Sequence, residues 1–280
     1  MKVHFKNRWK GMFILLGSLS VAGSVFADDG ASAAITPELT ARWWQWAFSI
    51  PSSVHPLSPI SDPTGAKYCM VGQQGDEWFL GGVFKTVDTS AASRRAQSKG
   101  NAGTLTVQEF TRECNDIPLG KSILIAVING ECSTAEELAL GNKVPADLYA
   151  KTRYLRNCAK KQADAMVPPG AGKNAARAYF GPVDSMGNPV EVKRVYTLVP
   201  FSVTYSPDNI LSSNCGMPSS DDFLCAPKPN PSLAQADGYW ARVRPQKAGK
   251  YKLVTFGAAP GFDFALRITY TLTFVAPKDQ

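Results

Sequence analysis

The chain contains very little histidine. Its 280 residues include only His4 and His55, and His4 falls in a segment that we expect to be removed. Histidine is the side chain best suited to proton transfer near neutral pH, and it is the commonest metal ligand. The sequence therefore argues against a site built from several histidines, and it leaves His55 as the one histidine that a catalytic triad would use.

Familiar catalytic motifs are absent as well. There is no Gly-x-Ser-x-Gly segment, which carries the nucleophile of many serine hydrolases. Residues 115–122 come close to a phosphate-binding loop, but Asn115 stands where that loop requires glycine. We predict no cofactor, and an enzyme of this composition would depend on His55 or on a pair of carboxylates.

Carboxylates remain as possible catalysts. Five of them lie in predicted loops or at strand ends: Asp62, Asp76, Glu77, Glu131 and Asp222. Glycoside hydrolysis needs two carboxyl groups at a fixed separation and no histidine. Nothing in the sequence brings any two of the five together, so salt bridges and turn caps are the alternative interpretation of each.

No apolar run is long enough to cross a membrane as a helix, which takes roughly 20 residues. The run at residues 12–21 follows four cations: Lys2, Lys6, Arg8 and Lys10. Val25 and Ala27 then occupy positions −3 and −1 of a cleavage site, a pattern typical of an export signal over residues 1–27. The formal net charge of +7, less these four cations and with no acidic residue lost, becomes +3.

All six cysteines lie beyond this segment: Cys69, Cys114, Cys132, Cys158, Cys215 and Cys225. An even number in an oxidising compartment indicates disulfides, and six cysteines allow about 15 pairings that sequence alone does not decide. Because short loops close at the lowest entropic cost, we expect Cys69–Cys114, Cys132–Cys158 and Cys215–Cys225. The spacing does not suit zinc, so we predict no metal.

Alternation of apolar residues predicts a β-rich fold. Residues 262–274 alternate without a break, and residues 195–205 alternate around Pro200, which indicates an edge or a bulge. Residues 122–128 are almost all apolar, so we expect a strand buried on both faces. Further strands are predicted at 78–84, 104–110 and 251–256.

Two helices are predicted. Thr36-Pro37-Glu38 is a helix start, and Pro51 ends that helix. A second helix is predicted over residues 146–166, where the basic residues form a solvated face rather than a nucleic-acid site: Lys151, Arg153, Arg156, Lys160 and Lys161. We expect a mainly β chain, a β-sandwich with two decorating helices, as one domain over 28–280 with a helical insertion near 134–166.

The tryptophans supply candidates for ligand binding. Trp43 and Trp46 share the apolar face of the first predicted helix, whereas Trp44 points away from that face, and we expect it to be exposed. An exposed tryptophan can stack on a sugar ring. We take Trp44, Trp78, Gln73 and Asp62 as the first binding candidates.

Several short segments carry a resemblance to known proteins. They are Trp44-Gln45-Trp46, Trp78-Phe79-Leu80-Gly81-Gly82, and Cys114 followed by Pro118-Leu119-Gly120-Lys121. Together they resemble a group of exported bacterial proteins. The resemblance implies export and a β-rich body, but it implies no reaction and no role for any residue.

The sequence thus predicts a non-enzymatic binding or structural protein of the cell envelope or the extracellular space. Its expected location is the periplasm or the medium, and its expected partner is a glycan or an envelope protein. We expect no nucleic-acid partner and no transmembrane segment. The alternative is a secreted hydrolase that uses paired carboxylates or His55.

Overall fold

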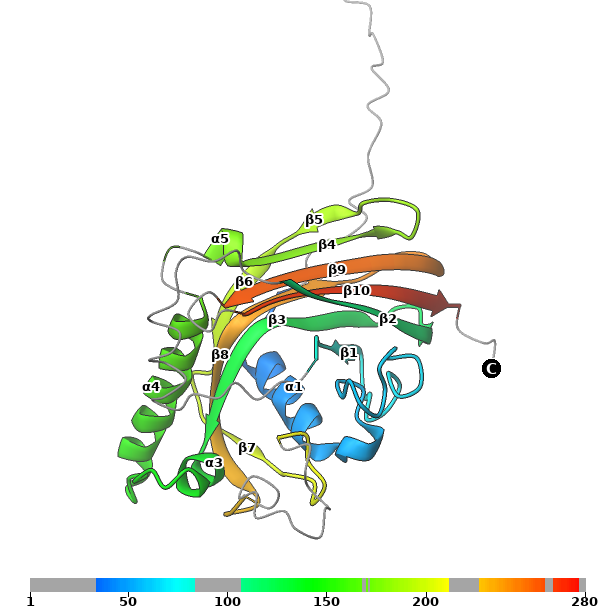
Figure 1. Ribbon diagram of the computed structural model, residues 1–280. Helices are drawn as coiled ribbons and strands as arrows, with labels where there is room; N and C mark the ends of the chain where they lie inside the picture. Colours follow the sequence, from blue (N-terminus) through cyan, green and yellow to red (C-terminus); the bar gives the residue numbers. More distant parts are fainter. Residues whose placement is uncertain are drawn as a thin grey trace, which may run out of the picture.

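The computed structural model describes residues 34–83, 107–167, 170, 172–211, 227–259 and 264–276. β-strands outweigh helices in the described residues and form two five-stranded sheets, with the longer helices packed against one of them (Figure 1). The prediction of a mainly β, sandwich-like fold with decorating helices is confirmed.

The first sheet, which we call sheet A, has the order β1-β3-β8-β6, and β7 also pairs with β8. Its strands are β1 (Glu77–Leu80), β3 (Ser122–Ser133), β6 (Val192–Tyr196), β7 (Phe201–Val203) and β8 (Ser232–Val243). β6 and β7 are two pieces of the predicted strand at 195–205, separated around Pro200. Both pieces run antiparallel to β8, so the proline breaks the strand without changing its partner.

The second sheet, sheet B, has the order β2-β10-β9-β4-β5. Its strands are β2 (Val107–Pro118), β4 (Ala176–Pro182), β5 (Asn188–Val190), β9 (Gly249–Ala259) and β10 (Phe264–Val275). β10 is the alternating segment of the sequence. Its even-numbered residues from Leu266 to Phe274 are buried, whereas Arg267 is exposed and the threonines between them are partly exposed, as expected of a half-buried strand.

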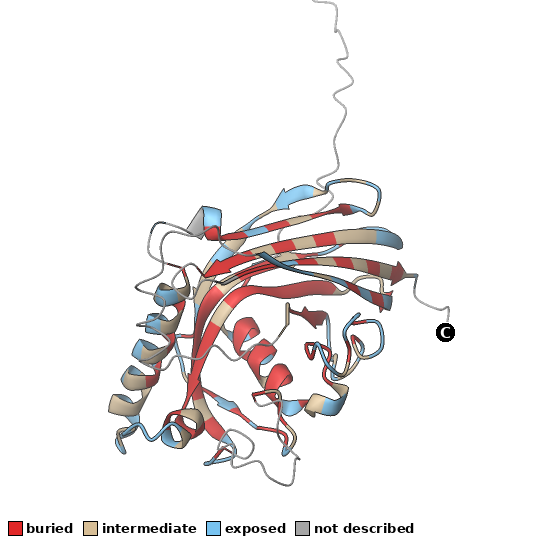
Figure 2. Cartoon of the chain, in the orientation of Figure 1, coloured by how far each residue is buried: buried red, intermediate tan, exposed pale blue. Residues whose placement is uncertain are grey.

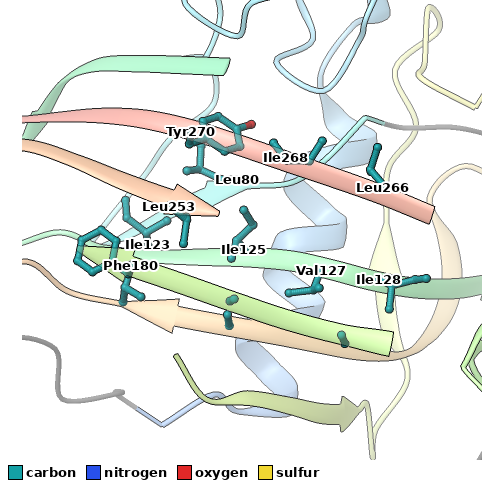
Figure 3. Packing of buried hydrophobic residues seen from close by; sticks show 14 of the residues in the cluster. Leu80, Ile123, Ile125, Val127, Ile128, Phe180, Leu253, Leu266, Ile268 and Tyr270 are labelled. Atoms are coloured by element: carbon teal, nitrogen blue, oxygen red, sulfur yellow. The ribbon is translucent and has the colours of Figure 1, made fainter. Parts of the chain in front are cut away.

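The inner faces of the two sheets meet in a dry core. Ile123 and Ile125 of β3 pack with Leu253 of β9 and with Ile268 and Tyr270 of β10 (Figure 3). These side chains are all almost completely buried. Burying apolar area at about 25 cal/mol per Å² is the main force that joins the two sheets.

The other face of sheet A is covered by helix α1, Pro37–Ser49. β3 is therefore buried on both faces, as predicted, because Leu124 and Ala126 pack towards α1 while their neighbours pack towards sheet B. The side-chain hydroxyl of Thr36 caps the helix by accepting a hydrogen bond from Leu39 N at 3.2 Å, and Ile50 ends it just before Pro51. A short 3₁₀ turn, η1 (Ser52–Val54), follows.

Helix α4, Leu148–Met166, lies on the side of sheet A that also faces sheet B, where β3 and β8 curve away (Figure 1). Two shorter helices, α3 (Thr134–Ala139) and α5 (Gly172–Ala175), flank it in the sequence. Gly130 permits the close approach of α4, since a Cβ there would lie 2.7 Å from the Oε1 atom of Gln162. No helix in the described ranges is both long and apolar enough to span a membrane.

Two disulfides join these layers. Cys69–Cys114 ties the loop before β1 to β2, and Cys132–Cys158 ties β3 to α4. Both pairs are the ones predicted from loop length. The third predicted pair, Cys215–Cys225, lies outside the described residues.

Candidate functional site

The four binding candidates chosen from the sequence do not form a site. Trp44 and Trp78 are core residues with exposed fractions of 5% and 6%. The prediction that Trp44 is exposed is wrong, because its ring packs against Trp43 and against Phe48 at ring-centroid distances of 5.0 and 5.2 Å. The burial of α1 on nearly all sides is visible in Figure 2.

Gln73 and Asp62 hold backbone in place. The Gln73 side chain donates from Nε2 to Phe79 O and accepts from Phe79 N, both at 2.8 Å, which fixes the loop to β1. Asp62 is buried, and its Oδ2 atom accepts from Tyr68 N at 2.8 Å. None of the four candidates lines either of the two hollows described below.

His55 is also occupied by backbone. Its Nδ1 atom accepts from Leu57 N at 3.0 Å, so Nε2 carries the proton that is shared with Ala47 O at 2.7 Å. The pKa of His55 is lowered from 6.5 to about 4, mainly by burial and also by the nearby Arg112 charge, although the hydrogen bond to Ala47 O opposes this shift. With both nitrogens engaged and no exposed surface, the ring has no position from which to act as a base.

The predicted carboxylate candidates are dispersed. Glu77 forms an ion pair with Arg242, and Asp76 lies 3.7 Å from Lys121 Nζ. Asp62 accepts a hydrogen bond from Tyr68 N, and Asp222 lies outside the described residues. Glu131 is the exception, because the structure places a second carboxyl group, that of Glu136, against it.

The carboxyl groups of Glu131, in β3, and Glu136, in α3, interact electrostatically. Burial raises the pKa of Glu131 well above its usual value, and the adjacent Glu136 raises it further. Glu136 also accepts from Ser133 Oγ at 2.8 Å and from Tyr205 OH at 3.1 Å, which completes the cap of α3. Because Glu131 is buried and Glu136 is engaged by Ser133 and Tyr205, these carboxyl groups belong to the packing around α3 rather than to an open site for a sugar.

One cluster in the described part of the chain brings three possible metal-ligand atoms within 4.8 Å of one another: Cys132, Glu137 and Cys158. Its two sulfur atoms are joined in a disulfide. The Glu137 carboxylate accepts hydrogen bonds from Tyr154 OH and from Asn142 Nδ2. These contacts make the cluster a junction between α3 and α4.

A hollow lies between α4, β6 and β8. Its volume is about 400 Å³, and it is lined by Arg156, Asn157, Lys160, Arg194, Tyr196, Ala236 and Asp237. We call it the α4 groove. Its position follows from the sheet: Arg194 and Tyr196 are two apart on β6 and so share one face, and Tyr196 pairs with Asp237 of β8. α4 forms the opposite wall.

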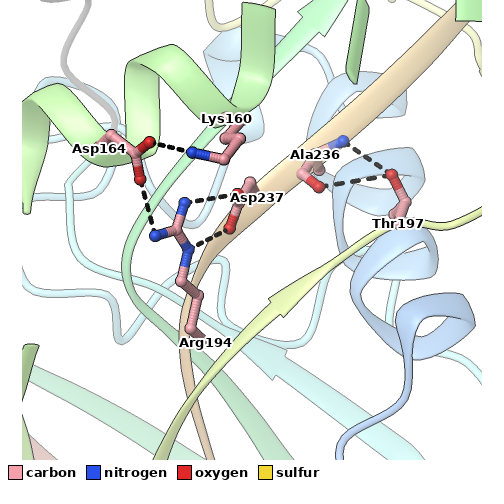
Figure 4. A network of polar contacts seen from close by, with 6 residues as sticks. All are labelled: Lys160, Asp164, Arg194, Thr197, Ala236 and Asp237. Carbon is pink, nitrogen blue, oxygen red and sulfur yellow. Dashed lines mark hydrogen bonds and ion pairs between the residues drawn. The ribbon is translucent and has the colours of Figure 1, made fainter. Parts of the chain in front are cut away.

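A network of ion pairs makes the floor of the α4 groove (Figure 4). Arg194 donates from Nε and Nη2 to the two carboxylate oxygens of Asp237, at 2.8 and 2.7 Å. Its Nη1 atom lies 2.8 Å from Asp164 Oδ1, and Lys160 of the same helix also contacts Asp164. A bidentate pair with a third ionic contact fixes the guanidinium in one orientation.

The electrostatics of the floor do not suit acid catalysis. The hydrogen bond from Lys160 lowers the pKa of Asp164, and Arg194 lowers it further although partial burial opposes both. Asp237 in turn raises the pKa of Arg194. A general acid at neutral pH needs a raised carboxyl pKa, whereas this carboxylate stays ionised.

The rim of the groove combines a cation with an aromatic ring. The Arg156 guanidinium lies over the Tyr196 ring at 4.9 Å from its centroid. Tyr196 keeps 43% of its surface exposed, and Arg156 and Asn157 are exposed as well. The groove thus offers hydrogen-bonding groups and an aromatic surface to a molecule from solution.

Sequence reasoning recognised only one wall of this site. Arg156 and Lys160 belong to the run of charges that we assigned to a solvated face. Arg194, Tyr196 and Asp237 gave no signal, because no spacing along the chain shows that β6 pairs with β8 next to a helix. The alternation of Arg194 and Tyr196 around Val195 was the one local sign that they share a face.

A second hollow of about 390 Å³ lies beside α1. It is lined by Arg42, Gln45, Trp46, Ser49, Gly72, Gln74, Phe79, Ser202 and Thr204. Gln45 Nε2 donates to Ser202 O at 2.9 Å, and Arg42 lies over the Phe79 ring. The polar groups of this hollow connect α1 to β7 and β1. We call it the α1 hollow and compare it below with the α4 groove.

Comparisons with known proteins give little. No protein-family model matches the chain, and no curated protein does. A solved structure described as "Structure of PbICP-C in complex with falcipain-2" is similar over 72% of this chain and 100% of that chain, at 10% identity and a TM-score of 0.21. Similarity at that score supports no conclusion about fold or function.

Proposed function

We propose that this protein is an exported binding protein that holds a glycan in the α4 groove. The observation that carries the proposal is the floor of the groove, where a guanidinium is held by two carboxylates beneath an exposed tyrosine. Export is supported by the signal-like residues 1–27 and by the two disulfides.

Sugars suit such a floor for a chemical reason. Each hydroxyl both donates and accepts hydrogen bonds, so a rigid array of guanidinium, carboxylate and amide groups can satisfy several of them at once. Arg194 and Asp237 are held in place before a ligand arrives, which lowers the entropic cost of binding. Tyr196 adds an apolar surface for the C–H face of a pyranose ring.

Binding rather than hydrolysis follows from the carboxyl groups. Asp164 and Asp237 are both held by Arg194, and the pKa of Asp164 is lowered. Glu131 is buried, Glu136 is engaged in the cap of α3, and His55 is engaged by backbone. No described carboxyl group combines a raised pKa with a place in the α4 groove.

The proposal can be tested with a substitution that fills the α4 groove with a large side chain. In Asn157→Trp a large ring replaces an exposed lining residue, and in the control Ala165→Trp the same ring stands at an exposed position of α4 outside the lining. The oxidised, exported protein is titrated by calorimetry with neutral and acidic oligosaccharides. We expect binding in the wild type and the control, and loss of at least about tenfold in Asn157→Trp, about 1.4 kcal/mol. Equal affinity in all three proteins, or no binding by the wild type, would refute the proposal.

A further inference from the structure

We infer that the α4 groove selects acidic sugars, and that Arg156 binds their carboxylate. This inference rests on the proposed function, because it names the class of glycan that the same groove takes. It follows from the charges that remain after the ion pairs of the groove have been counted.

The groove carries an uncompensated positive charge. Its cations are Arg156, Lys160 and Arg194, and its carboxylates are Asp237 and the adjoining Asp164. Three cations against two carboxylates leave a net charge of +1. Both carboxylates already contact Arg194, and Asp164 also serves Lys160, so neither is available to balance Arg156.

Arg156 is the cation without an acidic partner. Within the described ranges it forms no ion pair, and its guanidinium lies over the Tyr196 ring. A guanidinium stacked on an aromatic face keeps its N–H groups available at the edge of its plane. Those N–H groups form a fork that matches the two oxygens of a carboxylate.

The position of this fork relates the charge to the sugar. Arg156 stands at the rim beside Tyr196, and the fixed Arg194–Asp237 pair lies in the floor. A hexuronic acid carries its carboxylate on C5, next to the ring oxygen, whereas the hydroxyls on C2 and C3 lie across the ring, so its free hydroxyls and its charge lie at different edges. The groove offers the same division, with a charged fork at the rim and hydrogen-bonding groups below.

The rest of α4 adds to the attraction. Arg153 is exposed one turn before Arg156, where it lies over Tyr149. A surface with excess positive charge raises the local concentration of anions and speeds their association, and salt screens this effect over about 10 Å at 0.1 M. Binding of an acidic sugar should therefore weaken as salt rises, whereas binding of a neutral sugar should not.

The experiment uses two oligosaccharides that differ only in the acid. Cello-oligosaccharides and β-1,4-linked glucuronic acid oligomers of the same length share their linkage, and only the second carries carboxylates. We expect the acidic oligomer to bind wild-type protein at least about tenfold more tightly at low salt, the factor that 1.4 kcal/mol gives. Arg156→Gln should reduce this preference to within about twofold, since the fork and the charge are both lost.

Lys161→Gln is the matched control. It removes the same charge from an exposed position on the same helix that does not line the groove, and it should keep the acidic preference. Equal affinity for the two oligomers in wild type, or an unchanged preference in Arg156→Gln, would overturn the inference. If Asn157→Trp still blocks a neutral oligomer, the proposed function survives that result. If neither oligomer binds in the groove, both fail.

Discussion

Helices α1 and α4 pack against opposite faces of the same sheet but have opposite surfaces. Eight of the 13 residues of α1 are buried, against three of the 19 residues of α4. α1 uses large aromatic rings and α4 uses Leu155, Ala159 and Ala163. The aromatic helix is part of the core, and the basic helix is the one that is exposed to solvent.

The two helices are attached to the rest of the protein in different ways, which explains why α1 is buried and α4 is exposed. In α1, the indole N–H of Trp43 donates to Leu80 O at 2.8 Å, and that of Trp46 donates to Val71 O at 3.0 Å. The tryptophans therefore hold β1 and the loop before it, as well as filling space. α4 is held by small residues and by Cys132–Cys158, so its cations remain at the surface. Four further predictions test this contrast, starting with the largest effect.

The largest effect is expected from Trp43→Ala in α1. It removes a buried indole and leaves Leu80 O without its donor, which should cost about 3–5 kcal/mol of unfolding free energy. Lys161→Ala in α4 should change stability by less than about 0.5 kcal/mol. Denaturant unfolding measures both, and a loss below about 1 kcal/mol in Trp43→Ala would contradict the core assignment of α1.

The next largest effect is expected from the Cys132–Cys158 disulfide, which attaches α4 to β3 and which we call the α4 tether. Replacing both Cys132 and Cys158 by serine should cost about 2–4 kcal/mol, because the unfolded chain gains freedom. It should also weaken glycan binding, since the bond fixes one wall of the groove. Serine at both Cys69 and Cys114 should destabilise the protein and yet leave the affinity of the folded protein unchanged. If both double substitutions change the glycan affinity equally, the Cys132–Cys158 disulfide has no particular influence on the groove.

A loss of stability of similar size is expected when the pH falls, because His55 is buried in its neutral form. The pKa of His55 is about 4 in the folded protein against 6.5 as its ordinary value. The unfolded chain therefore binds a proton first as pH falls, and stability present above pH 6.5 is lost between pH 6.5 and 4, by about 3 kcal/mol. The raised pKa of Glu131 acts in the opposite direction, so the wild type is compared with His55→Gln. If the free energies of unfolding of wild type and His55→Gln change in parallel over this pH range, the assignment of His55 as a buried, neutral side chain is wrong.

The smallest effect is expected at the groove. Asp164→Asn removes a carboxylate whose side chain is 24% exposed and which is shared by Lys160 and Arg194. Its stability cost should be about 0.5–1 kcal/mol, in the range of surface ion pairs. The net charge of the groove rises by one unit, so the acidic oligomer should bind more tightly. Weaker binding of the acid would show that Asp164 positions the ligand.

Much of the framework could be predicted from local pattern. The start of α1, the alternation in β10, the apolar run in β3 and the pairings Cys69–Cys114 and Cys132–Cys158 all follow from residues close in sequence. Trp44 shows the limit of this reasoning. A helical wheel gives α1 one apolar face, but Phe48 packs on Tyr205 at 4.9 Å, so chain from beyond β7 covers the other side.

The groove could not be predicted for the same reason. It needs β6 and β8, about forty residues apart in the chain, to place Arg194 beside Asp237, and it needs α4 to face them. Charge patterning correctly identified the exposed cations of α4. It could not show that Asp164 is neutralised by Lys160 and Arg194 and that Arg156 is left without a carboxylate, because that balance exists only in three dimensions.

One measurement tests the contrast between the helices most directly. Amide hydrogen exchange, followed by mass spectrometry, is recorded with and without a saturating β-1,4-glucuronic acid oligomer. We predict slower exchange in residues 153–160 and 192–196 and no change in residues 42–49 and 72–79, which contribute most of the lining of the α1 hollow. Protection confined to the α1 hollow would place the ligand on the aromatic helix and contradict the account.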